Sequence, residues 1–125
     1  MKNILILGSE GFLGSVLVPN LLKTKKIFIT GVDKCYFGKN NLKNKRFKII
    51  KRDYSKIPKK FFKKFDYIID LVNISNDPAS ELNKKFTYKT NYTDKLKLYK
   101  KIENLKNIKR YIYMSSCSVY GNNKN

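Results

Sequence analysis

The residues best placed to do chemistry are three glycines near the start of the chain. Gly8, Gly11 and Gly14 come directly after an apolar run at residues 4–7. A glycine after a strand permits a tight turn, a second lets the backbone approach a phosphate, and a third lets the next helix pack closely. The spacing is G-x-x-G-x-x-G, whereas the commoner dinucleotide motif is G-x-G-x-x-G. The loop therefore indicates a dinucleotide phosphate site, with a turn whose glycines serve packing alone as the alternative.

Two carboxylates follow at positions that suit the rest of a dinucleotide. Asp33 lies at the end of the second apolar segment, about twenty residues after the loop, where an acid can accept hydrogen bonds from both ribose hydroxyls. The same charge would repel a 2′-phosphate, so Asp33 favours NAD over NADP, although the neighbouring Lys34 weakens that inference. Asp53, together with the Tyr54 amide, closes the third apolar segment and is a candidate contact for adenine. An acid that merely ends a strand is the alternative.

A group of serines near the end of the chain, Ser115, Ser116 and Ser118, supplies hydroxyl groups. The chain has no histidine, which excludes a Ser-His-Asp or Cys-His arrangement within it. Its two cysteines, Cys35 and Cys117, are far apart and outside any CxxC pattern, so neither a zinc site nor a disulfide framework is expected. Serines are also common in polar loops, and their presence alone does not make one of them catalytic.

The elements that must position these residues are visible as five apolar runs, at 4–7, 27–30, 47–50, 67–72 and 111–114. Their length and their content of Ile, Val, Phe and Tyr are typical of buried strands. Segments of helical length separate them, which predicts right-handed βαβ crossovers. We expect an α/β fold: a three-layer Rossmann-type parallel sheet of about five strands with helices on both faces. Ligands bind such a sheet at the carboxyl ends of its strands, and the last strand would form an exposed edge.

Four segments are expected to be helical. Residues 12–24 carry apolar side chains on one face, and after the fourth strand Asp77 is a candidate N-cap with Pro78 in the first turn. Residues 55–65 place phenylalanines on one side and lysines on the other. Residues 92–105 are expected to bury one apolar face. The side chains that define these last two faces are Phe61, Phe62 and Phe65 in the first segment, and Leu96, Tyr99, Ile102 and Leu105 in the second.

The chain has a formal net charge of +19, which raises the question of a nucleic-acid partner. All of its basic residues except Arg46, Arg52 and Arg110 are lysine, and the lysines are spread along the chain. Arginine, unlike lysine, can form two parallel hydrogen bonds with a phosphate or with the edge of guanine. We therefore interpret the charge as compositional drift with solvated lysine faces, and do not expect a nucleic-acid partner. No apolar run of transmembrane length or signal peptide is present, so the cytoplasm is expected and a membrane is not.

Several motifs together resemble the extended short-chain dehydrogenase/reductases, the NAD-dependent epimerase/dehydratase group. They are "GSEGFLGSVLVPNLL", "TGVDKCYFG", "IIDLVNISNDPASELN", "KTNYTDKLKL" and, above all, "RYIYMSSCSVYG", in this order along essentially the whole chain. The resemblance implies NAD as the cofactor and oxidation of a sugar hydroxyl to a ketone by hydride transfer to NAD. It also implies a nucleotide sugar as the substrate in the full-length context, and we keep a homodimer as a candidate assembly.

The resemblance also assigns roles to particular residues. Ser116 falls on the catalytic Ser/Thr of the family, whose hydroxyl can hydrogen-bond the reacting oxygen while a tyrosinate takes its proton. Alanines are usual in the family where Val72 and Asn73 stand here, and these larger side chains put close approach of that backbone to the cofactor in doubt. The residues to which the resemblance assigns cofactor binding are Gly8, Gly11, Phe12, Leu13, Gly14, Asp33, Asp53, Tyr54, Leu71, Val72, Asn73 and Asn91.

One family feature is missing from these 125 residues. A Tyr-x-x-x-Lys pair is expected roughly twenty residues after Tyr120, beyond Asn125; Tyr120 and Lys124 have that spacing but lie within the serine motif. We therefore expect residues 1–125 to be an NAD(P)-binding Rossmann-type domain that is C-terminally truncated, lacks the substrate-binding part and is inactive alone. A non-catalytic truncated NAD-binding module is the alternative, and a basic protein that contacts nucleic acid is a less favoured one.

Overall fold

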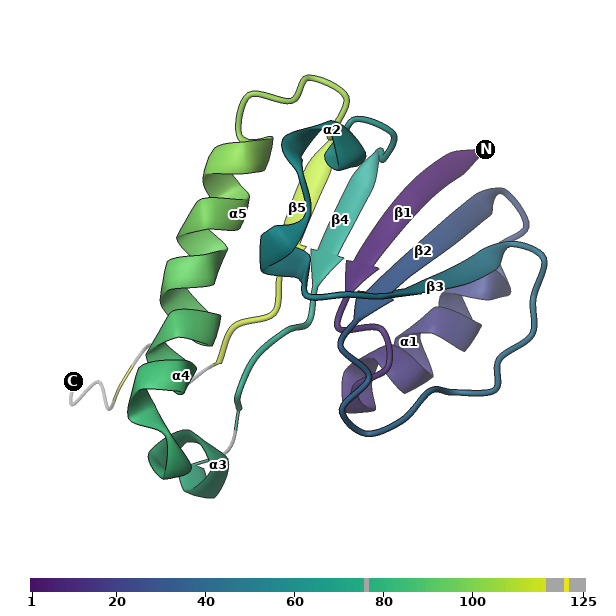
Figure 1. Cartoon of the computed structure of the whole chain (residues 1–125). Helices are drawn as coiled ribbons and strands as arrows, with labels where there is room; N and C mark the ends of the chain where they lie inside the picture. The colour runs from purple at the N-terminus through teal and green to yellow at the C-terminus, as the bar shows by residue number, and fades with distance from the viewer. Residues whose placement is uncertain (76, 117–120, 122–125) are drawn as a thin grey trace.

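The computed structural model describes residues 1–75, 77–116 and 121, and in this part of the chain a single parallel sheet forms the centre of the fold (Figure 1). Its five strands lie side by side in the order β3-β2-β1-β4-β5. All four pairings between neighbouring strands are parallel, so the carboxyl ends of the strands lie along one edge. The strands are β1 (Lys2–Leu7), β2 (Ile27–Asp33), β3 (Phe47–Lys51), β4 (Tyr67–Asp70) and β5 (Arg110–Tyr113).

Helices cover both faces of this sheet, which confirms the three-layer Rossmann-type arrangement (Figure 1). Helix α1 (Phe12–Leu22) packs on one face. The other face is covered by a 3₁₀ turn, η1 (Tyr54–Lys56), a short helix, α2 (Lys59–Phe62), and the longer α5 (Asp94–Ile102). Two short helices, α3 (Asp77–Leu82) and α4 (Lys84–Tyr88), and a π-helical turn, η2 (Lys89–Thr93), lead into α5.

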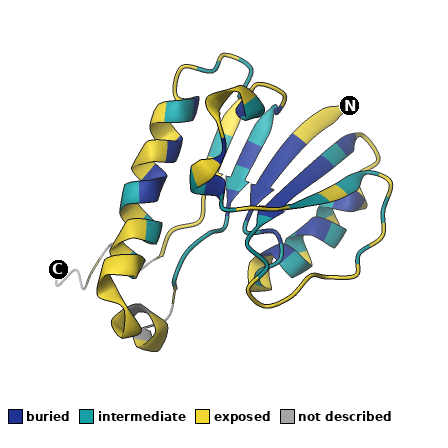
Figure 2. Ribbon diagram, viewed as in Figure 1, coloured by how far each residue is buried: buried dark blue, intermediate teal, exposed yellow. Residues whose placement is uncertain are grey.

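The apolar core is divided into two clusters by the sheet. Side chains of β1, β2 and β4 point alternately to its two faces, because successive residues of a strand face opposite ways. Figure 2 shows the inner strands as the most buried part of the molecule, whereas α3 and α4 are mostly exposed. The cluster under α1 consists of Ile4, Ile6, Val18, Leu22, Ile27 and Ile29. The cluster under α2 and α5 consists of Leu5, Leu7, Val32, Tyr54, Ile57, Phe62, Phe65, Ile68, Leu98 and Ile102.

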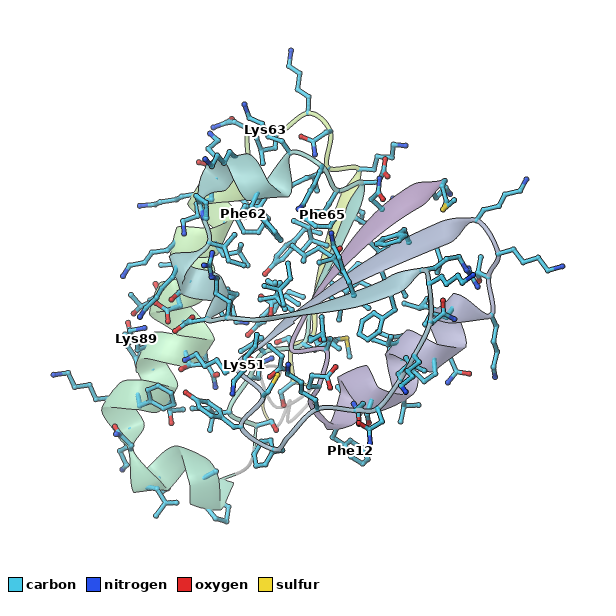
Figure 3. The ribbon with its side chains drawn as sticks, turned by 45° about the vertical axis from the view of Figure 1, so that its right-hand side comes forward. Phe12, Lys51, Phe62, Lys63, Phe65 and Lys89 are labelled. Carbon is cyan, nitrogen blue, oxygen red and sulfur yellow. The ribbon has the colours of Figure 1, made fainter. Side chains whose placement is uncertain are left out.

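The prediction of one helix over residues 55–65 was wrong. Proline has no N–H and restricts the preceding residue to an extended conformation. Pro58 accordingly divides the segment into η1 and α2, and Ile57 has φ −77° and ψ 129°. The predicted aromatic side was correct in its burial, since Phe62 and Phe65 are buried and point towards the sheet (Figure 3) and Phe61 packs against them.

The predicted helix over residues 92–105 begins earlier, and its buried face is only partly the predicted one: Ile102 is buried and Leu105 packs against the core, as expected. Its helical turns start at Lys89 in η2 and end at Ile102. Leu98 and Ile102 are buried, but Leu96 is 45% exposed and Tyr99 53% exposed, so these two do not belong to the buried face. Leu96 and Leu98 are both candidates by their type, and it is the position of the helix on the sheet that selects the second.

The sheet has a topological switch point between β1 and β4, its third and fourth strands in spatial order. The chain leaves β1 towards α1 on one face, and it leaves β4 towards α3, α4 and α5 on the other (Figure 1). Open α/β sheets bind ligands at such a switch point, in the crevice expected at the carboxyl ends of the two strands. Among the described residues, no helix has both the length and the apolar composition needed to cross a membrane.

Candidate functional site

The loop after β1 forms one wall of this crevice. Gly8 has φ +80°, a conformation that L side chains rarely adopt, and its N–H donates to the carbonyl of Val32 on β2 at 2.8 Å. Gly11 is the N-cap of α1 in an extended conformation, with no side chain capping the helix. Backbone N–H groups at the first turn of α1 therefore have no side-chain acceptor at the N-cap, and together with the helix dipole they favour an anion.

Gly14 is required by the loop itself. A Cβ built on Gly14 would lie 2.4 Å from the carbonyl oxygen of Ser9 and 2.5 Å from that of Gly8. Both contacts are with backbone atoms, so no rotation of a side chain can relieve them. The loop between Gly8 and Gly14 can keep its shape only if position 14 has no side chain. We expected this glycine to let α1 approach the strand, and the contacts show that it lets the loop fold back against α1.

Gly31, in the middle of β2, is a residue that the sequence analysis missed. A Cβ there would meet the Oγ of Ser9 at 2.3 Å and its Cβ at 2.8 Å. Ser9 is buried, and its side chain lies against the surface of β2 that Gly31 leaves open. A glycine inside an apolar strand is a recognisable sign that another part of the chain approaches closely. The absence of a side chain at Gly31 therefore lets Ser9, and with it the glycine loop, pack directly on β2.

The segment after β4 forms the opposite wall. A Cβ on Gly8 would lie 3.1 Å from the carbonyl carbon of Leu71 and 3.2 Å from the N and Cγ2 of Val72, so the two walls are in close contact at their base. Asn91 holds this segment through its carboxamide, which accepts from the N–H of Ile74 at 2.9 Å and donates to the carbonyl of Ile74 at 2.8 Å. In the structure Asn91 therefore positions the wall of the crevice.

Asn73 joins this wall to β5. Its Nδ2 donates to the carbonyl of Met114 at 2.7 Å, and its Oδ1 accepts from the hydroxyl of Tyr113 at 3.0 Å. These contacts bring the end of β5, which continues into Ser115 and Ser116, to the same edge of the sheet as the glycine loop. Ser116 is exposed. The rest of the serine motif, including Ser118 and Tyr120, lies outside the described residues.

Asp33 is the last residue of β2, and both of its carboxylate oxygens are engaged by backbone groups. Oδ2 accepts from the N–H of Glu10 in the glycine loop at 3.0 Å, and Oδ1 accepts from the N–H of Cys35 at 2.7 Å. Since a carboxylate has about four acceptor positions, two remain for a ligand. The carboxylate thus braces the loop and still presents acceptors at the crevice, and its contact with Cys35 is made where the backbone has a positive φ of 57°.

Asp53 does not stand alone at the end of β3. Its Oδ1 accepts from the N–H of Ser55 at 2.9 Å and from the Ser55 hydroxyl at 2.8 Å, and its Oδ2 is 3.0 Å from the ammonium of Lys34. Partial burial alone would raise the pKa of Asp53, but Lys34 and Ser55 hold this pKa below its usual value. The side chain of Tyr54 is buried in the core, so only its backbone is available to a ligand.

Phe12 and Leu13 begin α1 at the tip of the loop. Phe12 is 86% exposed and points away from the body of the molecule (Figure 3), and Leu13 is also exposed. The structure therefore brings together Gly8, Gly11, Gly14, Asp33, Leu71, Val72 and Asn73 around the crevice. Asp53 and Tyr54 lie at the next strand end, the side chain of Asn91 lies behind the wall, and Phe12 extends outward.

Beneath the crevice lies a buried ion pair that the sequence did not reveal. The carboxylate of Asp70, the last residue of β4, accepts from the ammonium of Lys95 on α5 at 2.6 Å, from the Tyr111 hydroxyl at 2.9 Å and from the N–H of Val72 at 3.0 Å. Burial lowers the pKa of Lys95, and Asp70 acts in the opposite direction. Burial, followed by the charge of Asp70, raises the pKa of Tyr111. This network supports the turn that begins at Val72.

Three comparisons with known proteins agree with this geometry. The model of the "NAD dependent epimerase/dehydratase family" matches residues 4–125. The chain is 34% identical to the bifunctional polymyxin resistance protein ArnA of Wigglesworthia glossinidia brevipalpis, over 97% of this chain but 19% of that protein. The chain therefore spans about a fifth of that curated relative's length.

Two solved structures have the same fold. A UDP-N-acetylglucosamine 4-epimerase from Methanobrevibacter ruminantium M1, in complex with UDP-N-acetylmuramic acid, has a TM-score of 0.85 and 32% identity, over 99% of this chain and 41% of that one. A UDP-glucuronic acid 4-epimerase from Bacillus cereus, in complex with UDP-glucuronic acid and NAD, has a TM-score of 0.81 and 24% identity, over 99% of this chain and 43% of that one.

Proposed function

This chain belongs to the NAD-dependent epimerase/dehydratase family, and from that premise we propose that it forms the NAD-binding portion of a nucleotide-sugar epimerase or dehydratase. The observation that carries the proposal is the space at Gly11. Among the described residues, a Cβ there would meet only the carbonyl oxygen of Gly8, at 3.5 Å, so no contact in that part of the chain requires a glycine at this position. A backbone left bare at the N-terminus of α1 suits the close approach of a pyrophosphate.

The residues around the crevice provide a place for each part of NAD. The backbone amides from Gly11 onward would hold the pyrophosphate, and Asp33 would accept hydrogen bonds from the adenosine ribose hydroxyls. Asp53 and the Tyr54 backbone lie one strand further out, where adenine would extend. The backbone from Leu71 to Asn73 lines the opposite side. When bound, NAD supplies the nicotinamide ring that accepts a hydride from the sugar carbon bearing the reacting hydroxyl.

We propose that the hydroxyl of Ser116 hydrogen-bonds the reacting oxygen of the sugar. Support comes from the contacts of Asn73 with Met114 and Tyr113, which bring the end of β5 to the crevice. The family's Tyr-x-x-x-Lys general base does not occur after the serine motif in these 125 residues. Because the chain covers 41% and 43% of the two epimerase structures, we propose that residues 1–125 correspond to the dinucleotide-binding part of such enzymes, without the substrate-binding part, and do not by themselves turn over a nucleotide sugar. A homodimer and a cytoplasmic location stay predictions.

The first test of the cofactor site is Asp33→Asn, which keeps the shape of the side chain and removes its charge. Hydrogen bonds to charged groups contribute about 1.5–3 kcal/mol each, so we expect the dissociation constant for NAD, measured by isothermal titration calorimetry, to rise by about 10- to 100-fold. We also expect a smaller preference for NAD over NADP, because the charge that repels the 2′-phosphate is gone.

The matched control for this variant is Asp66→Asn. Asp66 also accepts a hydrogen bond from a backbone N–H, that of Asn3, and pairs with Lys109, but it precedes β4 at the other edge of the sheet. It should leave NAD affinity unchanged. Equal NAD affinity in wild type and Asp33→Asn, or no binding to wild type at millimolar NAD, would contradict the proposed cofactor site.

A further inference from the structure

The ammonium of Lys34 lies close to three side chains, on the side of the crevice where the adenosine is proposed to bind. It lies 3.0 Å from Oδ2 of Asp53, which follows β3. It also lies 5.5 Å from the ring centroid of Tyr36, two residues further along the chain, and 5.6 Å from that of Phe86 on α4. A cation within about 6 Å of an aromatic ring is attracted to its face. Partial burial alone would lower the pKa of Lys34, but its contacts with Asp53 and Tyr36 raise this pKa above its usual value.

The position of Lys34 in the chain places it next to the proposed ribose site. Lys34 directly follows Asp33, whose carboxylate faces the ribose in the proposed function. A lysine here can reach either of two anions: the carboxylate of Asp53, or a phosphate on the ribose 2′-oxygen. Basic side chains next to this position are what a 2′-phosphate requires, whereas the carboxylate of Asp33 excludes it. In the structure the ammonium forms an ion pair with Asp53.

We propose that the Lys34–Asp53 ion pair reinforces the preference for NAD that Asp33 sets, because Asp53 holds the ammonium of Lys34 away from the ribose, where it could otherwise receive the 2′-phosphate of NADP. This inference rests on the proposed function. It gives Asp53 a second role: besides facing adenine, it keeps the site selective for NAD. Because Oδ1 of Asp53 is engaged twice by Ser55, the ion pair and an adenine amino group would share Oδ2.

Other lysines also lie near Asp33 and have to be separated from Lys34. Lys51, labelled in Figure 3, ends β3 in register with Asp33. Lys39 and Lys51 both act electrostatically on the neighbouring Cys35. Neither forms an ion pair with Asp53 among the described contacts, so a change at Asp53 releases Lys34 specifically. A double variant that also removes the Lys34 charge distinguishes Lys34 from these two.

The experiment compares wild type with Asp53→Asn, Lys34→Met and the double variant by calorimetric titration with NAD and with NADP at low salt. We expect Asp53→Asn to shift the ratio of the two dissociation constants towards NADP by about tenfold, since a charge-assisted hydrogen bond to phosphate is gained. Lys34→Met should leave the wild-type ratio within about twofold, and the double variant should lose the gain. The ratio is the readout because loss of an adenine contact weakens both cofactors equally.

Two results would overturn the inference while leaving the cofactor site intact: NAD binding with an unchanged ratio in Asp53→Asn, or a gain for NADP that persists in the double variant. The second result would assign the phosphate to Lys39 or Lys51. No NAD binding by wild type would instead overturn the proposed function, and this inference with it. Circular dichroism of each variant confirms that the fold is retained, and Ser55→Ala, which removes only the hydroxyl contact to Asp53, should leave the ratio unchanged.

Discussion

Replacing Gly14 with alanine is expected to weaken NAD binding by about a hundredfold and to lower the free energy of unfolding by about 1–3 kcal/mol. The reason is geometric. The new Cβ would lie 2.4 Å from the carbonyl oxygen of Ser9 and 2.5 Å from that of Gly8, and overpacking of this kind costs about 1–3 kcal/mol. Because both atoms are backbone, the loop itself must move, and with it the amides that face the pyrophosphate. Urea denaturation and calorimetric titration with NAD measure the two effects.

Gly11→Ala is the matched control, and it separates the fold from the ligand. Position 11 has φ −75° and ψ 177°, which any residue adopts, and its Cβ would meet only one atom, at 3.5 Å. The stability of this variant should stay within about 0.5 kcal/mol of wild type, whereas NAD binding should fall, since the methyl group occupies the path of the pyrophosphate. If Gly14→Ala bound NAD as wild type does, the loop would not be the cofactor site.

Replacing Lys95 with methionine is expected to lower the free energy of unfolding by about 3–5 kcal/mol, as measured by urea denaturation. The carboxylate of Asp70 would then be buried without its counter-ion, and the donors that remain among the described residues are the Tyr111 hydroxyl and the Val72 N–H. The stem of methionine still fills the space between the rings of Tyr54 and Tyr113, near which the ammonium lies. The loss is therefore assigned to the uncompensated charge rather than to a cavity.

Two further variants test this assignment. Lys109→Met breaks the exposed pair with Asp66 and should change the stability by less than about 1 kcal/mol. The double variant Asp70→Asn/Lys95→Met removes both buried charges and should be more stable than Lys95→Met alone, because the side chain of residue 70 is then neutral. A Lys95→Met protein within about 1 kcal/mol of wild type would show that the pair does not stabilise the fold.

The strands were the most predictable part of this fold. All five apolar runs form strands, and Asp33 does end β2 as the sequence indicated. A buried parallel strand reads as a continuous apolar run, so its position is evident without knowledge of its neighbours. The helices over residues 55–65 and 92–105 were less predictable. Pro58 carried a local signal that the phenylalanine pattern obscured, whereas nothing local distinguishes the exposed Leu96 from the buried Leu98.

The site divides in the same way. The tight turn at Gly8 and the need for a glycine at position 14 were both indicated by the sequence, although the contact that excludes a side chain at position 14 is with the loop and was not. The pairing of Lys34 with Asp53 depends on β2 and β3 being neighbours, and that of Lys95 with Asp70 on α5 packing against the end of β4. A lysine is ordinarily a surface residue, so its burial beside a carboxylate could only be found once the three-dimensional arrangement was known.

The most direct test of the central claim is a titration of the ¹⁵N-labelled chain with NAD, followed by the two-dimensional NMR spectrum of its backbone amides. We expect saturable shifts that are largest from Gly8 to Gly14, with further changes at Asp33 and Val72. Amides at the opposite edge of the sheet, such as those of Lys63 and Lys109, should be unaffected. Unchanged glycine-loop resonances at saturating NAD, or shifts confined to lysine-rich surfaces away from the crevice, would contradict this claim.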